Sequence, residues 1–328
     1  MNKKTLAYLF VSLSGLLFSL TAFSQLQQWP IKPIKIIVPY APGLSPDIVA
    51  RVLADKLSQS VGQPVLIDNR PGAGGLIGAE AAAIASPDGY TFFFTVKAVM
   101  AIAPHLYPNA KFNTFKDFKA VTQVLLVPHI LTATPNAPFN NIKELVDYAK
   151  RNPGKLNYAS LGVGSQPHVA VEIMANKLGL KINHIPYKTN PIADVISGIV
   201  DLNLEGASSA IPNIKAGKIK ALAISGNDRI SALPDLPTIT ESDNSLDQNG
   251  IIGSSWHGIF APTGTSDAII QKLNSELIRI IKTPDVQERL IALGLTPTGT
   301  TSNLLSNTVT LDYAYWGKLI KDLNIKLD

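Results

Sequence analysis

Short runs of β-branched residues alternate with amphipathic helical patterns along most of this 328-residue chain. In the first third, strands are expected at 34–38, 65–67 and 90–94, and helices lie between them at 48–61 and 79–85. The longer helix gathers its aliphatic residues on one face. Such alternation predicts parallel strands covered by helices.

The alternation restarts near the middle of the chain. Strands are expected at 156–159, 182–185, 202–204 and 221–224, with helices at 167–178 and 192–197. After a proline-rich connection, a strand in "SSWHGIFAP" and helices at 267–281, 285–293 and 302–323 close the chain. We therefore expect an α/β fold with two sheets, each mostly parallel and flanked by helices. About 300 residues are enough for two ordinary domains.

The N-terminus has the features of an export signal. Lys3 and Lys4 precede an apolar run at 6–20, and Ala22 and Ser24 are the small residues that a signal peptidase reads. A membrane anchor is the alternative, but serines interrupt the run and it is shorter than the roughly 20 residues of a usual span. We expect residues 1–24 to be removed by cleavage after Ser24 and the remainder to be periplasmic and not embedded in the membrane.

Composition narrows the chemistry. There is no cysteine, which excludes disulfides, thiolate metal sites and thiol nucleophiles. The chain has 29 Lys and Arg against 24 Asp and Glu, so removal of Lys3 and Lys4 leaves 27 against 24, a net charge of +3. No basic run is interleaved with aromatic residues, and nucleic acid is not an expected partner. The mild positive balance suits an anionic small molecule.

The segment "NRPGAGGLIGAE" at 69–80 is the most glycine-dense stretch. A dinucleotide loop requires G-x-G-x-x-G directly after a strand, and Ile77 occupies the position of its last glycine. Two interpretations remain open. The glycines present bare backbone N–H groups to a ligand, or Gly74, Gly75 and Gly78 let a helix pack closely on the sheet.

Two helices begin shortly after the first strand of each α/β half, at Ser45-Pro46-Asp47 and at Ser165-Gln166-Pro167. Ser45 and Ser165 are predicted to cap these helices, with a proline in the first turn. Ligands of open parallel sheets bind beyond the carboxyl ends of the strands. We therefore expect both helix N-termini to face one cleft, where their N–H groups favour an anion.

Catalytic machinery is not evident. The chain has five histidines outside any recognisable active-site motif and no G-x-S-x-G elbow. His168 and Glu172 have the i, i+4 spacing of a metal-ligand pair, but no third ligand is suggested and a local side-chain pair is favoured. We predict no cofactor and no metal. The alternatives are an exported enzyme acting on a small organic acid and, less favoured because of Ile77 and export, a dinucleotide-dependent oxidoreductase.

Several segments together carry a resemblance to a known family. They are "PIKIIVPYAPG", "GQPVLIDNRPGAGGLIGA", "SPDGYT", "NPGKLNYASLGVGSQPHVAVE", "HIPYK", "IPNIKAGKIKALAISG", "LPDLPTITE" and "WHGIFAPTGT". From Trp29 to the C-terminus, their order and spacing resemble the Bug-type extracytoplasmic solute receptors, the binding components of tripartite tricarboxylate transporters.

The resemblance implies a two-lobed, type II periplasmic binding fold with a cleft between the lobes. Lobe 1 would comprise 30–127 and 253–328, and lobe 2 would comprise 128–252. It also implies a receptor without catalytic activity that closes on a small carboxylate and delivers it to the membrane subunits of a transporter, or to a sensor. The ligand-binding residues implied by matching positions are Tyr40, Pro42, Gly43, Ser45, Asp47, Ala73, Gly74, Ser160, Gly164, Ser165 and His168.

Departures from the family pattern add three candidates. Leu44 replaces a usual glycine and is expected either to narrow the cleft or to shield it from water. Lys97 stands where relatives carry a small polar residue, and either pairs with a ligand carboxylate or reaches solvent. Glu205 either accepts a hydrogen bond from a ligand hydroxyl or ammonium group or pairs with a basic side chain. For Asp47, a role as an acid in the first helical turn is favoured over ligand contact.

Overall fold

The computed structural model describes residues 29–163, 165–187, 189–226, 228–243, 246 and 254–322. The predicted signal peptide, residues 1–24, and the predicted ligand-binding residue Gly164 lie outside this range. No helix in the described part of the chain combines the length and hydropathy needed to cross a membrane.

The first sheet has the strand order β11-β4-β10-β3-β1-β2. Its strands are β1 (Ile34–Val38), β2 (Val65–Asn69), β3 (Thr91–Val96), β4 (Phe118–Val127), β10 (Ser255–Pro262) and β11 (Thr296–Pro297). The helices that accompany it are α2 (Ser45–Val61), α3 (Leu76–Ala83), α4 (Ala103–Leu106), α10 (Asp267–Ile281), α11 (Pro284–Ala292) and α12 (Ser302–Asp322), with two short helical segments, η1 (Ala73–Gly75) and η2 (Ala98–Ile102).

The second sheet has the order β7-β6-β8-β5-β9. Its strands are β5 (His129–Ala133), β6 (Asn157–Ser160), β7 (Asn183–Pro186), β8 (Leu202–Gly206) and β9 (Lys220–Ile224). Its helices are α5 (Ile142–Arg151), α6 (Gln166–Leu178), α7 (Ile192–Ser197), α8 (Ala207–Lys215) and α9 (Ile239–Ser242).

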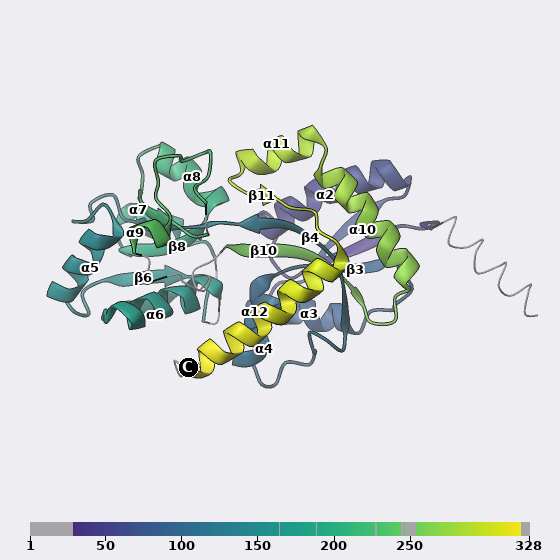
Figure 1. The fold of residues 1–328 in the computed structure, drawn as a ribbon, viewed down its shortest axis with the longest axis horizontal. Coiled ribbons are helices and arrows are strands. Elements are labelled where there is room, and N and C mark those ends of the chain that lie inside the picture. Colours follow the sequence, from purple (N-terminus) through teal and green to yellow (C-terminus); the bar gives the residue numbers. More distant parts are fainter. Residues whose placement is uncertain are drawn as a thin grey trace, which may run out of the picture.

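Each sheet forms the centre of one lobe, and the two lobes lie side by side (Figure 1), which confirms the expected two-lobed α/β fold. The sheets are mixed rather than mostly parallel. Strand β1 is parallel to β2 and β3, and β6 is parallel to β7 and β8. Strands β4, β5 and β10 run antiparallel to their neighbours because they lie where the chain passes between the lobes. The exact lobe boundaries stay a prediction, and residue 253 is outside the described range.

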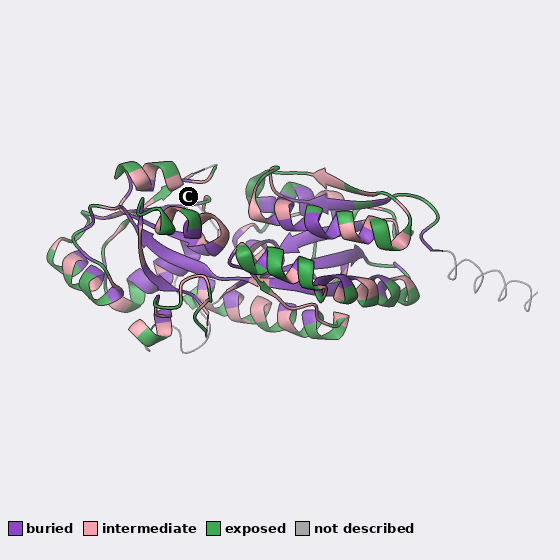
Figure 2. Ribbon diagram, turned by 90° about the horizontal axis from the view of Figure 1, so that it is seen from above, coloured by how far each residue is buried: buried purple, intermediate pink, exposed green. Residues whose placement is uncertain are grey.

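Both sheets are buried between helices whose outer faces are exposed (Figure 2). Ile36, Leu53 and Leu277 belong to one core cluster, in which α2 and α10 cover the first sheet. The long helix α12 joins two other clusters. Its Leu305 packs with the first lobe, whereas its Trp316 belongs to a cluster that contains second-lobe residues. Apolar burial of this kind is the main stabilising contribution to such lobes.

Candidate ligand-binding cavity

A cavity of about 270 Å³ lies between the lobes and is lined by residues from both. The loop before α2, the segment before α6, the end of β8 and the first residues of β5 and β10 contribute to its wall. Seven of the predicted site residues line it: Tyr40, Gly43, Leu44, Ser45, Gly74, Ser165 and Glu205. The structure therefore brings Ser45, Gly74 and Ser165 to one shared hollow.

Three helices begin at this cavity. They are α2, α6 and α8, of 17, 13 and 9 residues, and Ser45, Gln166 and Ser208 from their first turns line the wall. The first N–H groups of a helix have no partner within the helix, and its dipole is positive at this end. Their convergence gives the cavity N–H donors and a positive potential without a basic side chain.

The two serines at the first helix starts behave differently. Ser165 caps α6 as predicted, because its Oγ accepts from the backbone N–H of His168 at 3.4 Å. For Ser45 the predicted cap is wrong. Helix α2 already includes Ser45, and the residue at the cap position is Leu44, which makes no side-chain cap bond. The Ser45 Oγ is buried with no hydrogen-bond partner among the described residues, although Ser45 lines the cavity.

Asp47 does not line the cavity but holds the loop that does. Its carboxylate accepts from the Gly43 N–H at 2.8 Å, from Asn69 Nδ2 at 3.0 Å and from Arg51 Nη2 at 2.9 Å. Burial raises the pKa of this carboxyl, but the bonds from Arg51, Gly43 and Asn69 outweigh burial and the net pKa is lowered. Asp47 is an ionised first-turn acid that ties Gly43 to α2.

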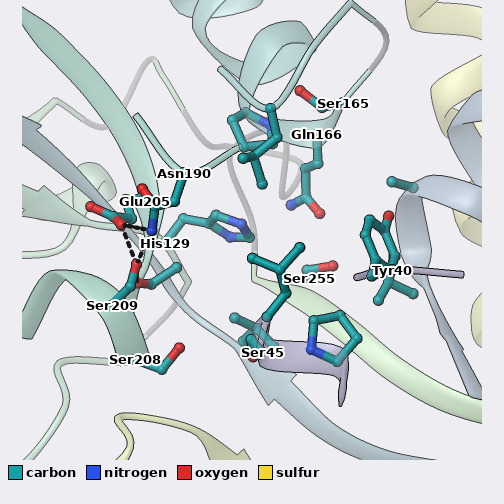
Figure 3. A pocket seen from close by; sticks show the side chains of 18 of the residues that line it. Tyr40, Ser45, His129, Ser165, Gln166, Asn190, Glu205, Ser208, Ser209 and Ser255 are labelled. Atoms are coloured by element: carbon teal, nitrogen blue, oxygen red, sulfur yellow. Dashed lines mark hydrogen bonds between the residues drawn. The ribbon is translucent and has the colours of Figure 1, made fainter. Parts of the chain in front are cut away.

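A polar cluster forms one side of the cavity (Figure 3). Glu205 Oε1, at the end of β8, accepts from Asn190 Nδ2 at 2.9 Å and from the Ser209 hydroxyl. Glu205 Oε2 is buried and has no partner among the described residues. Burial raises the pKa of this carboxyl against the opposing effect of the Ser209 and Asn190 bonds. The interpretation of Glu205 as half of an ion pair is not supported.

Two histidines line the cavity. His129 is the first residue of β5, and His257 lies near the start of β10. Burial lowers the pKa of His129 to about 4, with a contribution from the charge of Lys97, and lowers the pKa of His257 to about 3, with a contribution from His129. Both rings are therefore neutral near pH 7, and in each the Nδ1 atom has no partner within the described chain.

The described lining contains no lysine and no arginine. Leu44, Val49, Leu161 and Leu295 make much of the wall apolar. A small organic molecule with an apolar middle and polar ends matches such a surface, because apolar walls supply affinity and a few placed polar groups supply orientation.

Lys97 does not reach this cavity. Its Nζ donates to the Ser254 carbonyl at 2.9 Å and lies 3.8 Å from Asp312 Oδ2, and the side chain borders a separate hollow. Only 6% of Lys97 is exposed, so neither predicted position, in the cleft or in solvent, is correct. The Lys97 side chain therefore links the end of β3 to the residue before β10 and to α12.

The other predicted residues lie near the cavity without lining it. Pro42 is exposed in the turn before α2, and Ala73 is exposed at the start of η1. Ser160 is fully buried, with its Oγ 2.7 Å from His184 Nε2, and the His168 ring centroid lies 4.1 Å from that of His184. The local pair of His168 and Glu172 stays a prediction, and the Glu172 carboxylate accepts from the Tyr158 hydroxyl at 2.6 Å.

Two glycines of the glycine-rich segment have different surroundings. Gly74 lines the cavity and has φ of 65°, in the left-handed region that favours glycine. Gly78 is a packing glycine, because a Cβ there would lie 2.6 Å from Pro39 Cβ and 2.7 Å from Pro39 Cα.

Sequence reasoning missed several lining residues. They are Tyr107, His129, Gln166, Asn190, Ser208, Ser209, Ser255 and His257. Two of them lie in patterns that mark a helix start. Gln166 belongs to Ser165-Gln166-Pro167, and Asn190 precedes Pro191, with its side chain accepting from the Ile192 N–H at 3.0 Å.

Relatives of the chain are receptors of one family. Protein BugT of Bordetella pertussis is 32% identical over 322 residues, which cover 97% of this chain and 96% of BugT. The periplasmic binding protein BugD is 33% identical with a TM-score of 0.81, covering 91% of this chain and 99% of BugD. A Rhodopseudomonas palustris protein solved with adipate is 30% identical with a TM-score of 0.84, and the match covers 91% of this chain and 99% of the R. palustris chain.

A second R. palustris protein, MatC with bound malate, is 29% identical with a TM-score of 0.80, and the match covers 89% of this chain and all of MatC. The family described as "Tripartite tricarboxylate transporter family receptor" matches residues 49–325. The family and these structural neighbours are solute-binding receptors and not enzymes, and membership implies export. This chain therefore belongs to the tripartite tricarboxylate transporter family of receptors.

Proposed function

We propose that this receptor captures a small carboxylated organic solute between its lobes and delivers it to the membrane subunits of a tripartite tricarboxylate-type transporter, or to a sensor. The observation that carries the proposal is the convergence of three helix N-termini on a cavity without lysine or arginine among its described residues. Such ends bind carboxylates through backbone N–H groups. The relatives solved with adipate and malate support the same class of ligand.

Closure of the lobes would complete the site. The Tyr107 hydroxyl, from the first lobe, donates to the Val163 carbonyl of the second at 3.3 Å, and both residues line the cavity. Contacts of this kind exist only when the lobes are together, so they bias a two-state hinge toward the closed form. In this proposal, the chain reaches the periplasm after cleavage following Ser24. Lobe 1 then consists of residues 30–127 together with 253–328, and lobe 2 consists of residues 128–252.

Native mass spectrometry of the gently purified mature protein, followed by calorimetric titration with short mono- and dicarboxylates, tests the proposal. We expect a retained small acid and a saturable carboxylate affinity at one site per chain. A protein that retains no acid and binds none of the carboxylates would contradict the proposed ligand class.

A further inference from the structure

Four strands of the second sheet begin at the same edge of that sheet. Strand β6 is parallel to β7 and β8, and β5 is antiparallel to both β8 and β9, so β6, β7, β8 and β9 all start on one side. The other edge, where β8 ends at Glu205 and Gly206, faces the cavity. The strand starts therefore lie at the end of the second lobe that points away from the first lobe, where α5 also lies (Figure 1). A partner bound there would leave the cavity free.

An exposed lysine stands at the same position before three of these strands. Lys155 lies two residues before β6, Lys181 two residues before β7, and Lys218 two residues before β9. Before β8 the exposed residue is Ile199, with 66% of its surface accessible. The sheet order β7-β6-β8-β5-β9 places these four residues in a row about 20 Å long, with the isoleucine inside it. We call Lys155, Lys181, Ile199 and Lys218 the distal row.

Further cations lie at the ends of the neighbouring helices. Lys150 and Arg151 are in the last turn of α5, and Lys177 is in the last turn of α6. The helix dipole favours cations at these positions, so these three residues need no other explanation. The same reason does not apply to the lysines of the distal row, because they precede strands.

The acidic residues near the distal row have partners of their own. Asp147 pairs with Lys143 at 2.9 Å, and Asp201 accepts from the Asn157 N–H at 2.8 Å. Glu144 is bonded to the loop before α5. The three lysines of the distal row form no ion pair with another described residue. Their charge is therefore not neutralised within the described part of the chain.

The composition of the distal row favours one kind of partner. Protein–protein interfaces are enriched in arginine and depleted in lysine, and every cation of the row is a lysine. Lysines around an exposed aliphatic side chain are typical of surfaces that lie on anionic lipid, because the cations attract the headgroups while the apolar side chain enters the interface. Membership of this receptor family implies export, which brings the chain to a membrane surface.

We propose that the distal row binds anionic phospholipid headgroups, with Ile199 entering the headgroup region, so that the second lobe rests on the membrane while the cavity stays accessible. This inference goes beyond the proposed function and does not depend on which solute the cavity binds. A receptor held in this way searches for its membrane partner along the membrane surface instead of through the whole compartment.

Sedimentation of the mature protein with lipid vesicles tests the proposal. The vesicles contain phosphatidylcholine alone or phosphatidylcholine with about one third phosphatidylglycerol. We expect binding to the anionic vesicles only, and a loss of at least about tenfold between about 50 mM and about 300 mM salt, because ions screen the attraction. Equal binding to both vesicles, or no binding to the anionic vesicles at low salt, would overturn the proposal.

Two triple variants with the same net charge locate the binding surface. The first replaces the lysines of the distal row and should weaken binding to the anionic vesicles at least about tenfold: Lys155→Gln, Lys181→Gln and Lys218→Gln. The matched control replaces three exposed cations of the first lobe: Lys116→Gln, Lys282→Gln and Arg289→Gln. It should bind within about threefold of the unaltered protein, and Ile199→Ser should bind more weakly by about threefold or more. Urea unfolding verifies that each variant is folded.

Three further outcomes are decisive. An equal loss in both triple variants would show that net charge alone drives binding and would overturn the role of the distal row. Salt-sensitive binding to native membrane vesicles but not to phosphatidylglycerol vesicles would assign the row to an acidic membrane protein and overturn the lipid proposal. Failure of every carboxylate to bind would contradict the proposed function but would leave vesicle binding unchanged, so the two failures are distinguishable.

Discussion

Replacement of Ser45 by alanine should change affinity and stability in opposite directions. Ser45 lines the cavity, and its Oγ is buried without a hydrogen-bond partner in the described chain. A buried hydroxyl without a hydrogen bond costs about 1–3 kcal/mol, and alanine is the better helix former. The ligand-free Ser45→Ala protein should therefore be as stable as the original or more stable by up to about 1 kcal/mol.

The same change should weaken ligand binding. If the hydroxyl donates to a carboxylate at the start of α2, the lost bond is a charged one and contributes about 1.5–3 kcal/mol. That corresponds to about a tenfold to hundredfold higher Kd. Calorimetric titration with the identified acid measures the affinity, and urea unfolding without ligand measures the stability. Ser306→Ala, at an exposed position on α12, is the matched control.

An unchanged Kd in folded Ser45→Ala protein would refute this reasoning. It would mean that the ligand leaves the hydroxyl unpaired and that α2 is not part of the anion site. A large loss of stability would show instead that the hydroxyl has a structural partner.

Three further changes test other parts of the account. Gly78→Ala should lower the free energy of unfolding by about 1–3 kcal/mol in urea, because its Cβ would meet the Pro39 backbone at 2.7 Å; unaltered stability would show that α3 can shift freely. Lys97→Met should lower the free energy of unfolding by about 1–3 kcal/mol, because it removes the donor to the Ser254 carbonyl. The same change should alter ligand affinity less than about threefold, and a tenfold loss of affinity would indicate that Lys97 contacts the ligand. Burial lowers the pKa of the His257 ring from 6.5 in the unfolded chain to about 3 in the folded protein. As the pH drops below about 6.5, the ring is therefore protonated in the unfolded chain but not in the folded protein, and the free energy of unfolding falls. Between pH 7 and pH 5, His257 should account for about 2 kcal/mol of the fall in the free energy of unfolding. Urea unfolding at these two pH values should show that His257→Phe lacks this contribution. An equal fall in the variant and the original protein would contradict a buried neutral ring.

The strands and helices with clear periodicity were predictable. The run at 34–38 is β1, and the helix expected at 267–281 is α10 with the same bounds. Strands β4 and β5 were not predicted. Their segments, "FKAVTQVLLV" and "HILTA", are almost entirely buried, so they lack the alternation that marks a half-exposed strand. Because these strands carry the chain between the lobes, their omission also hid the mixed character of both sheets.

The cavity was predictable where its residues belong to loops with a recognisable pattern. Gly43, Leu44 and Ser165 fall in such loops, and all three line the wall. His129 and His257 carried no local signal, because they become neighbours only through the pairing of distant strands. Lys97 was predicted as a site residue but does not line the cavity. Its ion-pair partner Asp312 lies on α12, more than two hundred residues away in the sequence, so no local pattern could reveal the pair.

Helix α12 supports the cavity wall from outside the cavity. It packs against the first lobe near Leu305, and its Asp312 accepts from Trp256 Nε1 at 2.6 Å while lying 3.8 Å from Lys97 Nζ. Trp256 is in β10, directly between the cavity residues Ser255 and His257. The α12 contacts therefore fix the strand that carries the floor of the cavity without contacting a ligand themselves.

A crystal structure of the mature protein with the acid that it retains tests the central claim most directly. The account predicts one carboxylate of that acid between the lobes, with its oxygens within hydrogen-bond distance of backbone N–H groups at the starts of α2 and α6. A ligand held elsewhere, or a carboxylate in contact with Lys97 and with none of the helix N-termini, would contradict it.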